Sequence, residues 1–561
     1  MSHKHFFNTL LSVSLILTTL VHVHTASAQL LKGSIGIHDP STIVKSGSTY
    51  WIFMTGSKIP SRYSTDLITW TDASVAMPTR PSWIDTAVPN FKNNNDTYWA
   101  PDIAYFGGKY YLYYSCSTFG SPVSAIGVAT ASTPAGPWTD QGMVVQSQTT
   151  SNFNAIDPSI LVDGSNVYMA YGSWSAGIAV VQLDPSTGKV KSGSTPVRVA
   201  GGSGADWEGA CLIKEGSYYY LFVNRGSCCN GTSSTYYIVV GRSTSPTGPF
   251  VDKNGTDLKS GGGSTMLSSS GRFIGPGHVG LLRQAGSNFV SIHFYDGNDN
   301  GAPKLDIINM GFSSNWPFLT RDWIAAGTYT IKNINSGMNW DAWGCTGVTG
   351  QAVAQGTASS SLTCQKWIFT TTGNGAYQIK TAMSTGNVVD IINCGSANGT
   401  KLQLYSALNN DCQKFRVFRT ADGSHVFNPV NSEKVVEVPG AATTAGTQLG
   451  LWDYNGCACQ KWTITAASGS RLAFDEMNSD NEISVYPNPT ARNRGFSVVL
   501  GEKEVGMYNC INLIDSKGSI ARSKKIEGRT NTFSELNLAS GLYIIQLVSE
   551  TKVVTRKVVL E

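Results

Sequence analysis

Short apolar stretches alternate with polar turns along most of the chain, and one arrangement of them occurs five times between residues 33 and 323. Each copy has a polar residue that opens a mostly apolar strand, then a turn that contains glycine, then a strand rich in tyrosine or phenylalanine. The copies begin at intervals of about 50 to 70 residues, which is typical of a β-propeller made of four-stranded blades. We therefore predict a five-bladed β-propeller over residues 33–323. The residues that open the five copies are Asp39, Asp102, Asp157, Glu208 and His278.

Equivalent positions in successive blades lie on a ring around the propeller axis, so these five ionisable residues are expected to converge at one mouth of the central channel. A single Asp before Pro is commonly explained by turn formation, because its side chain bonds to nearby backbone donors. Five ionisable residues in one register are harder to explain in that way, because clustered carboxylates repel one another. The pattern favours a functional site at the mouth of the channel.

Acids gathered in such a site could hydrolyse a glycosidic bond. That reaction needs one protonated carboxyl and one ionised carboxylate, which an inverting enzyme holds about 6.5 to 9.5 Å apart so that a water molecule fits between them. A third acid can raise the pKa of the proton donor by like-charge repulsion. The opposite sides of a narrow channel could supply the gap.

The segments around the five openings carry a family resemblance. They read HDPS at residues 38–41, WAPD at 99–102, AIDPS at 155–159, WEGA at 207–210 and GPGH at 275–278. Together they resemble the signatures of glycoside hydrolase family 43. Two longer stretches, residues 228–243 and 293–305, are similar to the arabinanases of that family in particular.

The resemblance implies an inverting enzyme that cleaves α-1,5-linked L-arabinan, a side chain of pectin in the plant cell wall. We expect it to cut within the polymer rather than at its end. It implies that Asp39 is the general base, that Glu208 is the general acid and that Asp157 tunes and orients this acid. It also implies that His278 lies on the propeller axis beside a calcium ion that is bound largely through water.

We expect four further residues to contact substrate: Trp99, Asp102, Asn154 and Ser173. Trp99 offers a flat apolar face for a sugar ring, worth on the order of 1 kcal/mol, although a core Trp between blades would look the same in sequence. Asp102 could bond to substrate or hold the end of a strand. The loop after Ser173 is one residue shorter than is common in the arabinanases of the family, which leaves endo and exo action both open.

A second repeat of three units follows between residues 326 and 466, and it predicts a β-trefoil. The units end in QKW, QKF and QKW, at residues 365–367, 413–415 and 460–462. Each unit has an acid well before this ending (Asp341, Asp390, Glu437), followed at a constant spacing by Gly356, Tyr405 or Trp452. An acid can bind sugar hydroxyls and an aromatic ring can stack on the sugar.

The second repeat resembles the ricin-type lectins, and this makes Asp390 with Tyr405, and Glu437 with Trp452, candidate sugar-binding pairs. The first unit lacks the aromatic residue. Cysteines occupy like positions in the first two units, so we expect one disulfide within each unit, Cys345 with Cys364 and Cys394 with Cys412. Cys228 and Cys229 are adjacent, and we expect this strain to disfavour a bond between them.

The two ends of the chain concern export. Residues 1–28 have a polar start, an interrupted apolar run and a small-residue cleavage pattern, which predicts a signal peptide rather than a membrane anchor. A polar linker over residues 467–481 leads to residues 482–561, where alternating strands predict a small β-sandwich. This tail is similar to the C-terminal sorting domain of type IX secretion, although an immunoglobulin-like spacer would have a similar pattern. We therefore expect a secreted or cell-surface protein.

Composition agrees with an all-β chain. Glycine is abundant at 59 residues and charged residues make up only 14% of the chain, which favours strands and tight turns over long helices. The net charge of +4 is small and not concentrated, so nucleic acid is not an expected partner. We expect a monomer without a membrane span.

The alternatives to an endo-acting arabinanase are an exo-acting α-L-arabinofuranosidase, another family 43 activity such as a xylosidase or galactanase, and a non-catalytic carbohydrate-binding surface protein.

Overall fold

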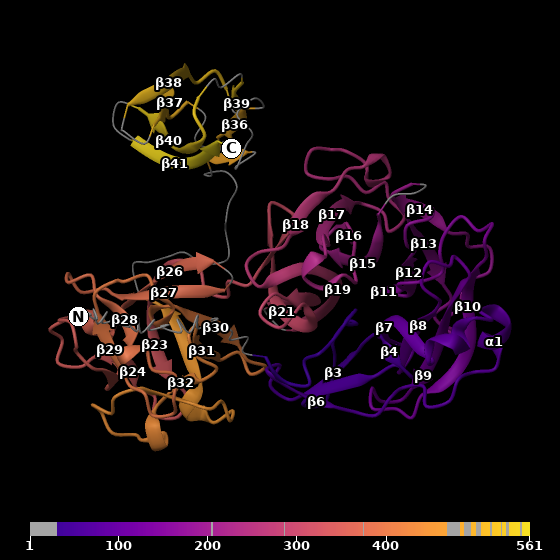
Figure 1. The fold of residues 1–561 in the computed structure, drawn as a ribbon, viewed down its shortest axis with the longest axis horizontal. Coiled ribbons are helices and arrows are strands. Elements are labelled where there is room, and N and C mark those ends of the chain that lie inside the picture. Colours follow the sequence, from indigo (N-terminus) through magenta and orange to yellow (C-terminus); the bar gives the residue numbers. More distant parts are fainter. Residues whose placement is uncertain are drawn as a thin grey trace, which may run out of the picture.

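The computed structural model describes residues 31–202, 206–284, 287–373, 375–467, 483–486, 495–500, 506–515, 519–528, 530–534, 538–549 and 553–560. The predicted signal peptide and nearly all of the predicted linker lie outside these ranges. Within them the fold is all-β, as predicted, with a propeller, a trefoil and a small sandwich in chain order (Figure 1).

The propeller consists of five sheets, one for each blade. Their described strand pairs are antiparallel except in blade 1, where β1 lies parallel to β6. Blade 1 contains β1 (Lys32–Gly33), β2 (Val44–Ser46), β3 (Thr49–Phe53), β5 (Ser61–Ser64) and β6 (Thr69–Asp72). Blade 2 contains β4 (Gly56–Ser57), β7 (Thr97–Phe106), β8 (Lys109–Cys116), β9 (Ser124–Ala131) and β10 (Thr139–Ser147), with a short helix α1 (Trp83–Ala87) before β7.

Blades 3 to 5 are four-stranded sheets whose strands follow one another in chain order. Blade 3 contains β11 (Ser159–Asp163), β12 (Asn166–Tyr171), β13 (Ile178–Leu183) and β14 (Val197–Ala200). Blade 4 contains β15 (Glu208–Glu215), β16 (Tyr218–Arg225), β17 (Tyr237–Ser243) and β18 (Ser264–Leu267). Blade 5 contains β19 (Phe273–Gln284), β20 (Ser287–Asp296), β21 (Ala302–Ser313) and β22 (Trp316–Thr320).

A ring of five hydrogen bonds joins each blade to the next at a turn that lies before or within β2, β7, β11, β15 or β19. In each bond a backbone N–H at a turn in the left-handed region, with φ between 40° and 57°, donates to a side chain of the preceding blade. The bonds are Ala100 to Thr55 Oγ1 (2.8 Å), Asp157 to Ser115 Oγ (3.0 Å), Gly209 to Asp157 Oδ2 (3.1 Å), His278 to Asn224 Oδ1 (2.8 Å) and Asp39 to His293 Nδ1 (3.1 Å). The last bond closes the ring between blades 5 and 1.

This ring corrects the register predicted for the repeat. The equivalent positions are Asp39, Ala100, Asp157, Gly209 and His278. Asp102 therefore lies two residues too late in blade 2, and Glu208 lies one residue too early in blade 4. The prediction aligned the five copies by their ionisable residues, whereas the backbone turn defines the repeat.

The trefoil is a closed barrel of six strands with three hairpins attached. The aromatic residues that follow the repeated Gln-Lys, namely Trp367, Phe415 and Trp462, are fully buried in its core. The barrel strands are β23 (Gly327–Asn333), β26 (Trp367–Gly373), β27 (Ala376–Thr381), β30 (Phe415–Arg419), β31 (His425–Pro429) and β34 (Trp462–Ala466). The hairpins pair β24 (Asn339–Ala342) with β25 (Val353–Gly356), β28 (Val388–Ile391) with β29 (Leu402–Tyr405), and β32 (Val435–Glu437) with β33 (Gly450–Trp452).

The trefoil packs directly against the propeller. The backbone N–H of Ala421 donates to the carbonyl of Asp66 at 3.2 Å, and the Tyr454 hydroxyl donates to the carboxylate of the same residue at 3.2 Å. Ile68 of the propeller is buried with Val426 and Val435 of the trefoil in one small apolar cluster. These contacts fix the two parts as neighbours, as Figure 1 also shows.

The C-terminal sandwich has two sheets around a core of its own. One sheet contains β35 (Ser484–Tyr486), β36 (Phe496–Val499) and β39 (Thr530–Phe533). The other contains β37 (Cys510–Ile514), β38 (Ile520–Lys525), β40 (Gly541–Val548) and β41 (Val553–Leu560). In the described part of the chain no helix has the length and apolar character needed to cross a bilayer.

Candidate active site

A pocket of about 650 Å³ opens at the mouth of the propeller channel. Asp39, Asp157 and Glu208 all line it, so the structure brings together the three acids that the sequence singled out. Trp99, Asn154 and Ser173 line it as well. The exposed rings of Phe119 and Trp174 stand on its wall.

Asp39 lies within a cluster of three histidines. Its Oδ2 is 2.9 Å from His38 Nδ1 and accepts a hydrogen bond of 2.6 Å from Thr55 Oγ1. Its Oδ1 is 3.6 Å from Nδ1 of both His278 and His293. Burial acts to raise the pKa of Asp39, but the charge and hydrogen bond of His38 outweigh it and hold the pKa well below its usual range. Asp39 is therefore a carboxylate at any ordinary pH, as a general base must be.

Glu208 has the opposite electrostatic character. Burial raises its pKa above the ordinary value, although two hydrogen bonds work against this shift. Ser173 Oγ donates to Oε2 at 2.8 Å, and the Tyr236 hydroxyl donates to Oε1 at 2.9 Å. These bonds fix the orientation of the carboxyl group, while burial favours its protonated form. Glu208 therefore has the properties of a proton donor.

Asp157 is the most strongly perturbed of the three acids. Its side chain is buried, and burial raises its pKa well above the usual value, with further contributions from the negative charges of Glu208 and Asp39. The N–H of Gly209, the residue after Glu208, donates to Asp157 Oδ2 at 3.1 Å. Asp157 thus interacts with Glu208 by charge and anchors the strand that carries it.

The other predicted substrate contacts differ in their surroundings. Trp99 is half-buried and lines the pocket, so its ring is not confined to the core. Ser173 is buried and holds Glu208. Asn154 Oδ1 accepts a long hydrogen bond of 3.4 Å from Ser147 Oγ.

Asp102 does not line the pocket. Its Oδ1 accepts the backbone N–H of Thr42 at 3.0 Å, and its Oδ2 accepts that of Ile160 at 2.8 Å. Burial raises the pKa of Asp102 to about 6. Because each oxygen binds a neighbouring blade, this arrangement favours the second interpretation of Asp102, a residue that holds strand ends.

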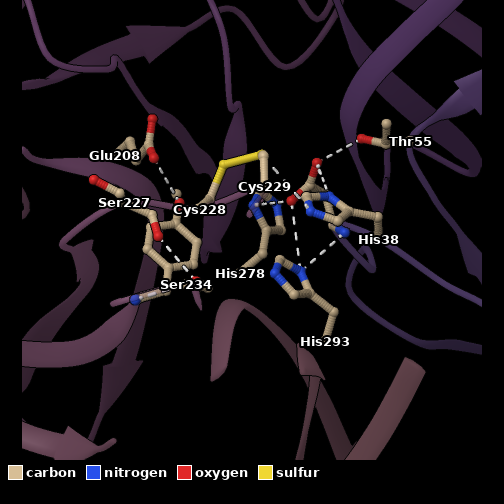
Figure 2. The surroundings of a disulfide bond; sticks show 12 residues. His38, Thr55, Glu208, Ser227, Cys228, Cys229, Ser234, His278 and His293 are labelled. Atoms are coloured by element: carbon tan, nitrogen blue, oxygen red, sulfur yellow. Dashed lines mark hydrogen bonds and ion pairs between the residues drawn. A yellow bond between two sulfur atoms is a disulfide. The ribbon is translucent and has the colours of Figure 1, made fainter. Parts of the chain in front are cut away.

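One wall of the pocket is a disulfide between the adjacent residues Cys228 and Cys229, and the expectation that these would not pair is wrong. Cys229 has a φ of 63°, and this left-handed turn brings the two side chains together. Its N–H donates to the Tyr295 hydroxyl at 2.7 Å, and that hydroxyl is 2.7 Å from His38 Nε2. Figure 2 shows the disulfide between Glu208 on one side and His38 on the other.

Several site residues did not emerge from the sequence as functional candidates: Thr55, Asn224, Tyr236, His293 and Tyr295. One signal could have found Thr55, Asn224 and His293, because each is a polar residue in or just after the last part of a strand rich in tyrosine or phenylalanine, namely β3, β16 and β20. Tyr236 and Tyr295 lie in the two stretches that resemble the arabinanases, but each is one tyrosine among many in this chain, and the folded structure reveals their contacts.

The predicted calcium site can be compared with the side chains around His278. This residue is 6% exposed and burial lowers its pKa, so it is a neutral imidazole. His38, Asp39 and His293 place ligand atoms within 4.8 Å of one another. Calcium prefers six to eight oxygen ligands, whereas this cluster offers imidazoles and a single carboxylate. These residues do not fit a calcium ion that is coordinated directly by protein.

In the trefoil, each predicted sugar-binding pair lies on one face of its own hairpin, Asp390 with Tyr405 on β28 and β29, and Glu437 with Trp452 on β32 and β33. Tyr405 and Trp452 are exposed by 37% and 42%, while Asp390 and Glu437 are buried. In all three units the Gln of the repeat donates to the acid, at 2.7 Å for Asp341, 3.0 Å for Asp390 and 3.2 Å for Glu437. Since the first unit has this bond but no aromatic partner, the bond belongs to the fold. The predicted disulfides Cys345–Cys364 and Cys394–Cys412 are both present.

Three families match successive parts of the chain. Residues 34–317 match "Glycosyl hydrolases family 43". Residues 313–405 and 411–494 match "Ricin-type beta-trefoil lectin domain-like". Residues 484–561 match "Secretion system C-terminal sorting domain".

Similar proteins cover the propeller half of the chain. The extracellular endo-α-(1→5)-L-arabinanase 1 of Bacillus subtilis is 39% identical over 323 residues, which are 56% of this chain and 96% of that protein. The extracellular exo-α-(1→5)-L-arabinofuranosidase ArbA of Cellvibrio japonicus is 36% identical over 303 residues, 50% of this chain and 86% of that protein. The crystal structure of an exo-1,5-α-L-arabinanase from a bovine ruminal metagenomic library is 40% identical, covers 50% of this chain and 96% of that one, and has a TM-score of 0.48.

Proposed function

Because this chain belongs to the glycosyl hydrolases of family 43, we propose that it is an arabinan endo-1,5-α-L-arabinosidase with Asp39 as general base and Glu208 as general acid. The observation that carries the proposal is that the pKa values of two carboxyl groups in one pocket are shifted in opposite directions. Burial raises the pKa of Glu208, whereas His38 holds the pKa of Asp39 well below its usual range despite burial.

The proposed reaction is a single displacement. Glu208 gives its proton to the glycosidic oxygen as the bond to the sugar breaks, while Asp39 takes a proton from the water that attacks the anomeric carbon from the opposite side. Asp157 and Glu208 disfavour each other's ionisation, because two negative charges in one pocket repel, and the bond from Gly209 to Asp157 keeps the strand of Glu208 in place. Trp99 offers a face for a sugar ring, and Asn154 is a further candidate contact in the pocket.

The proposal can be tested with purified protein on linear and on branched arabinan. A ladder of short arabino-oligosaccharides supports endo action. Glu208→Gln should lower the rate by about 10²- to 10⁴-fold, because the amide cannot donate the proton. Glu215→Gln, at the other end of strand β15, is the matched control and should keep the wild-type rate.

An exo-acting enzyme is the second candidate, because a relative of similar identity is named as an exo-arabinofuranosidase. Arabinose alone from the first time point would support that candidate. Absence of product from both polymers would contradict the substrate, and xylan and galactan would then be tested as substrates of other activities in the family.

We retain in the proposal a calcium ion beside His278 whose ligands are mostly water, but no step of the reaction depends on it. Activity and melting temperature after treatment with EDTA, and after calcium is added back, test this part. Unchanged values in both measurements would remove the ion from the proposal.

The match of residues 484–561 to a sorting domain and the extracellular relatives indicate a secreted or cell-surface protein. We propose that the route is type IX secretion after a signal peptide, and that the protein acts as a monomer on arabinan of the plant cell wall. Removal of residues 484–561 should leave the enzyme inside a host that has this secretion system. Unchanged export of the shortened protein would contradict the route.

A further inference from the structure

A small cavity lies at the seam between blade 5 of the propeller and the trefoil, far from the acids of the active site in the fold. Its volume is about 20 Å³, enough for one water molecule or one small ion. Arg321 and Asp306 line it from the propeller, and Arg416 lines it from strand β30 of the trefoil. Apolar walls, including Phe273 and Trp323, complete it.

Arg416 is the unusual member of this group. Its side chain is buried, with 8% of the residue exposed, yet its Nε and Nη1 atoms have no hydrogen-bond partner. Arg321 donates from Nε to Asp306 Oδ2 at 2.7 Å, but its Nη2 atom is also buried without a partner. Two guanidinium groups that border one cavity therefore have unused donors.

The charges around the cavity do not balance. Arg272, Arg321 and Arg416 lie in this region, but Asp296 pairs with Arg272 and Asp306 pairs with Arg321. Within the described ranges no carboxylate forms an ion pair with Arg416. Burial and the nearby Arg272 lower the pKa of Arg416 to about 10, so it is still charged at neutral pH. A buried charge without a counter-ion is strongly unfavourable.

We propose that this cavity binds one small monovalent anion such as chloride, held by the free N–H groups of Arg416 and Arg321. The anion neutralises the excess charge, satisfies donors from both parts of the chain and so stabilises the contact between propeller and trefoil. The cavity is too small for sulfate or for a sugar carboxylate.

The test compares the melting temperature of the full chain in sodium chloride and in sodium gluconate at equal ionic strength. Above the dissociation constant, each tenfold increase in chloride should raise the melting temperature by about 1 to 2 °C, and gluconate should have no such effect. Arg416→Met, which removes the charge and keeps the volume, should abolish the difference between the two salts. Arg419→Met, on the same strand, is the matched control and should retain it.

A second measurement does not depend on any variant. A crystal of the full chain soaked in sodium bromide should show an anomalous peak between Arg416 and Arg321. Equal melting temperatures in the two salts, a chloride effect that survives in Arg416→Met, or the absence of a bromide peak would each overturn the proposal and leave a water molecule as the occupant.

Discussion

At the scale of single residues, the structure assigns different electrostatic states to carboxyl groups that look alike in sequence. Asp39 has histidines around it, Glu208 has two hydroxyl donors, and Asp102 has two backbone N–H donors. The neighbours of a carboxyl group therefore decide whether it suits the proposed role of a base, that of an acid, or that of a link between blades.

Tyr236 should set the alkaline limit of activity. Its hydroxyl donates to Glu208 and thereby stabilises the ionised form, which lowers the pKa of this acid. Tyr236→Phe removes the bond, so the pKa of Glu208 should rise and the acid should stay protonated to higher pH. The alkaline limb of the kcat/KM profile should then move upward in pH. A limb that stays in place would mean that Glu208 does not control it.

Asp157→Asn should stabilise the folded protein and lower its activity. The folded-state pKa of Asp157 is raised, chiefly by burial, so the native state binds this proton more tightly than the unfolded chain does. Stability is therefore lost as pH rises from the unfolded pKa of about 3.9 through the folded pKa. The variant should melt higher than wild type at neutral pH and match it near pH 3, while activity falls by about 10²-fold. A lower melting temperature at neutral pH would contradict this account.

Asp102→Asn distinguishes a link between blades from a substrate contact. The Asn amide would place an NH₂ donor against the N–H of Thr42 or Ile160, and the unpaired donors should cost about 1–3 kcal/mol of unfolding free energy. Denaturant unfolding measures this loss. KM should be unchanged, and an increase in KM at unchanged stability would restore the role in substrate binding.

At the scale of elements, the number and order of the blades could be predicted because turn residues and tyrosine-rich strands recur at a regular interval. The exact register could not, because it depends on a left-handed turn that is occupied by Asp39 in one blade, Ala100 in another and Gly209 in a third, so no one residue type marks it. The three acids of the pocket were found because they are ionisable and repeated. The partners that determine their protonation come from other blades, and sequence distance hides them.

The vicinal disulfide is an element whose removal should affect catalysis. Cys228→Ala with Cys229→Ala frees the turn that donates to Tyr295, and through Tyr295 contacts His38 beside the base. We expect kcat/KM to fall by about tenfold, within the range of a positioning effect. The matched control is Cys457→Ala with Cys459→Ala. It removes a trefoil disulfide whose cysteines are also close in sequence, and it should leave kcat/KM unchanged. If both double variants had the same kcat/KM, the turn at Cys228 and Cys229 would have no part in positioning the proposed base.

At the scale of the whole molecule, the trefoil is packed on the propeller, so any sugar that it binds is held at a fixed position relative to the pocket. Tyr405→Ala and Trp452→Ala should weaken retention on insoluble arabinan-rich cell wall without changing kcat/KM on soluble oligosaccharides. Trp343→Ala is the control, because Trp343 is 45% exposed but belongs to neither predicted pair. A co-sedimentation assay measures retention, and equal loss in all three variants would argue against specific sites.

The bond from the Asp39 N–H to His293 lies where the last blade meets the first. Among the described strands none of blade 5 pairs with a strand of blade 1, and hydrogen bonds such as those from Ser291 Oγ to the Ser41 carbonyl and from the Ile43 N–H to the Leu281 carbonyl hold the junction together. The proposed base is thus part of the contact that closes the ring of blades. Activity should therefore depend on closure of the ring. On gradual heating, a molecule in which blades 1 and 5 have separated should lose activity while its blades still give a native circular dichroism spectrum.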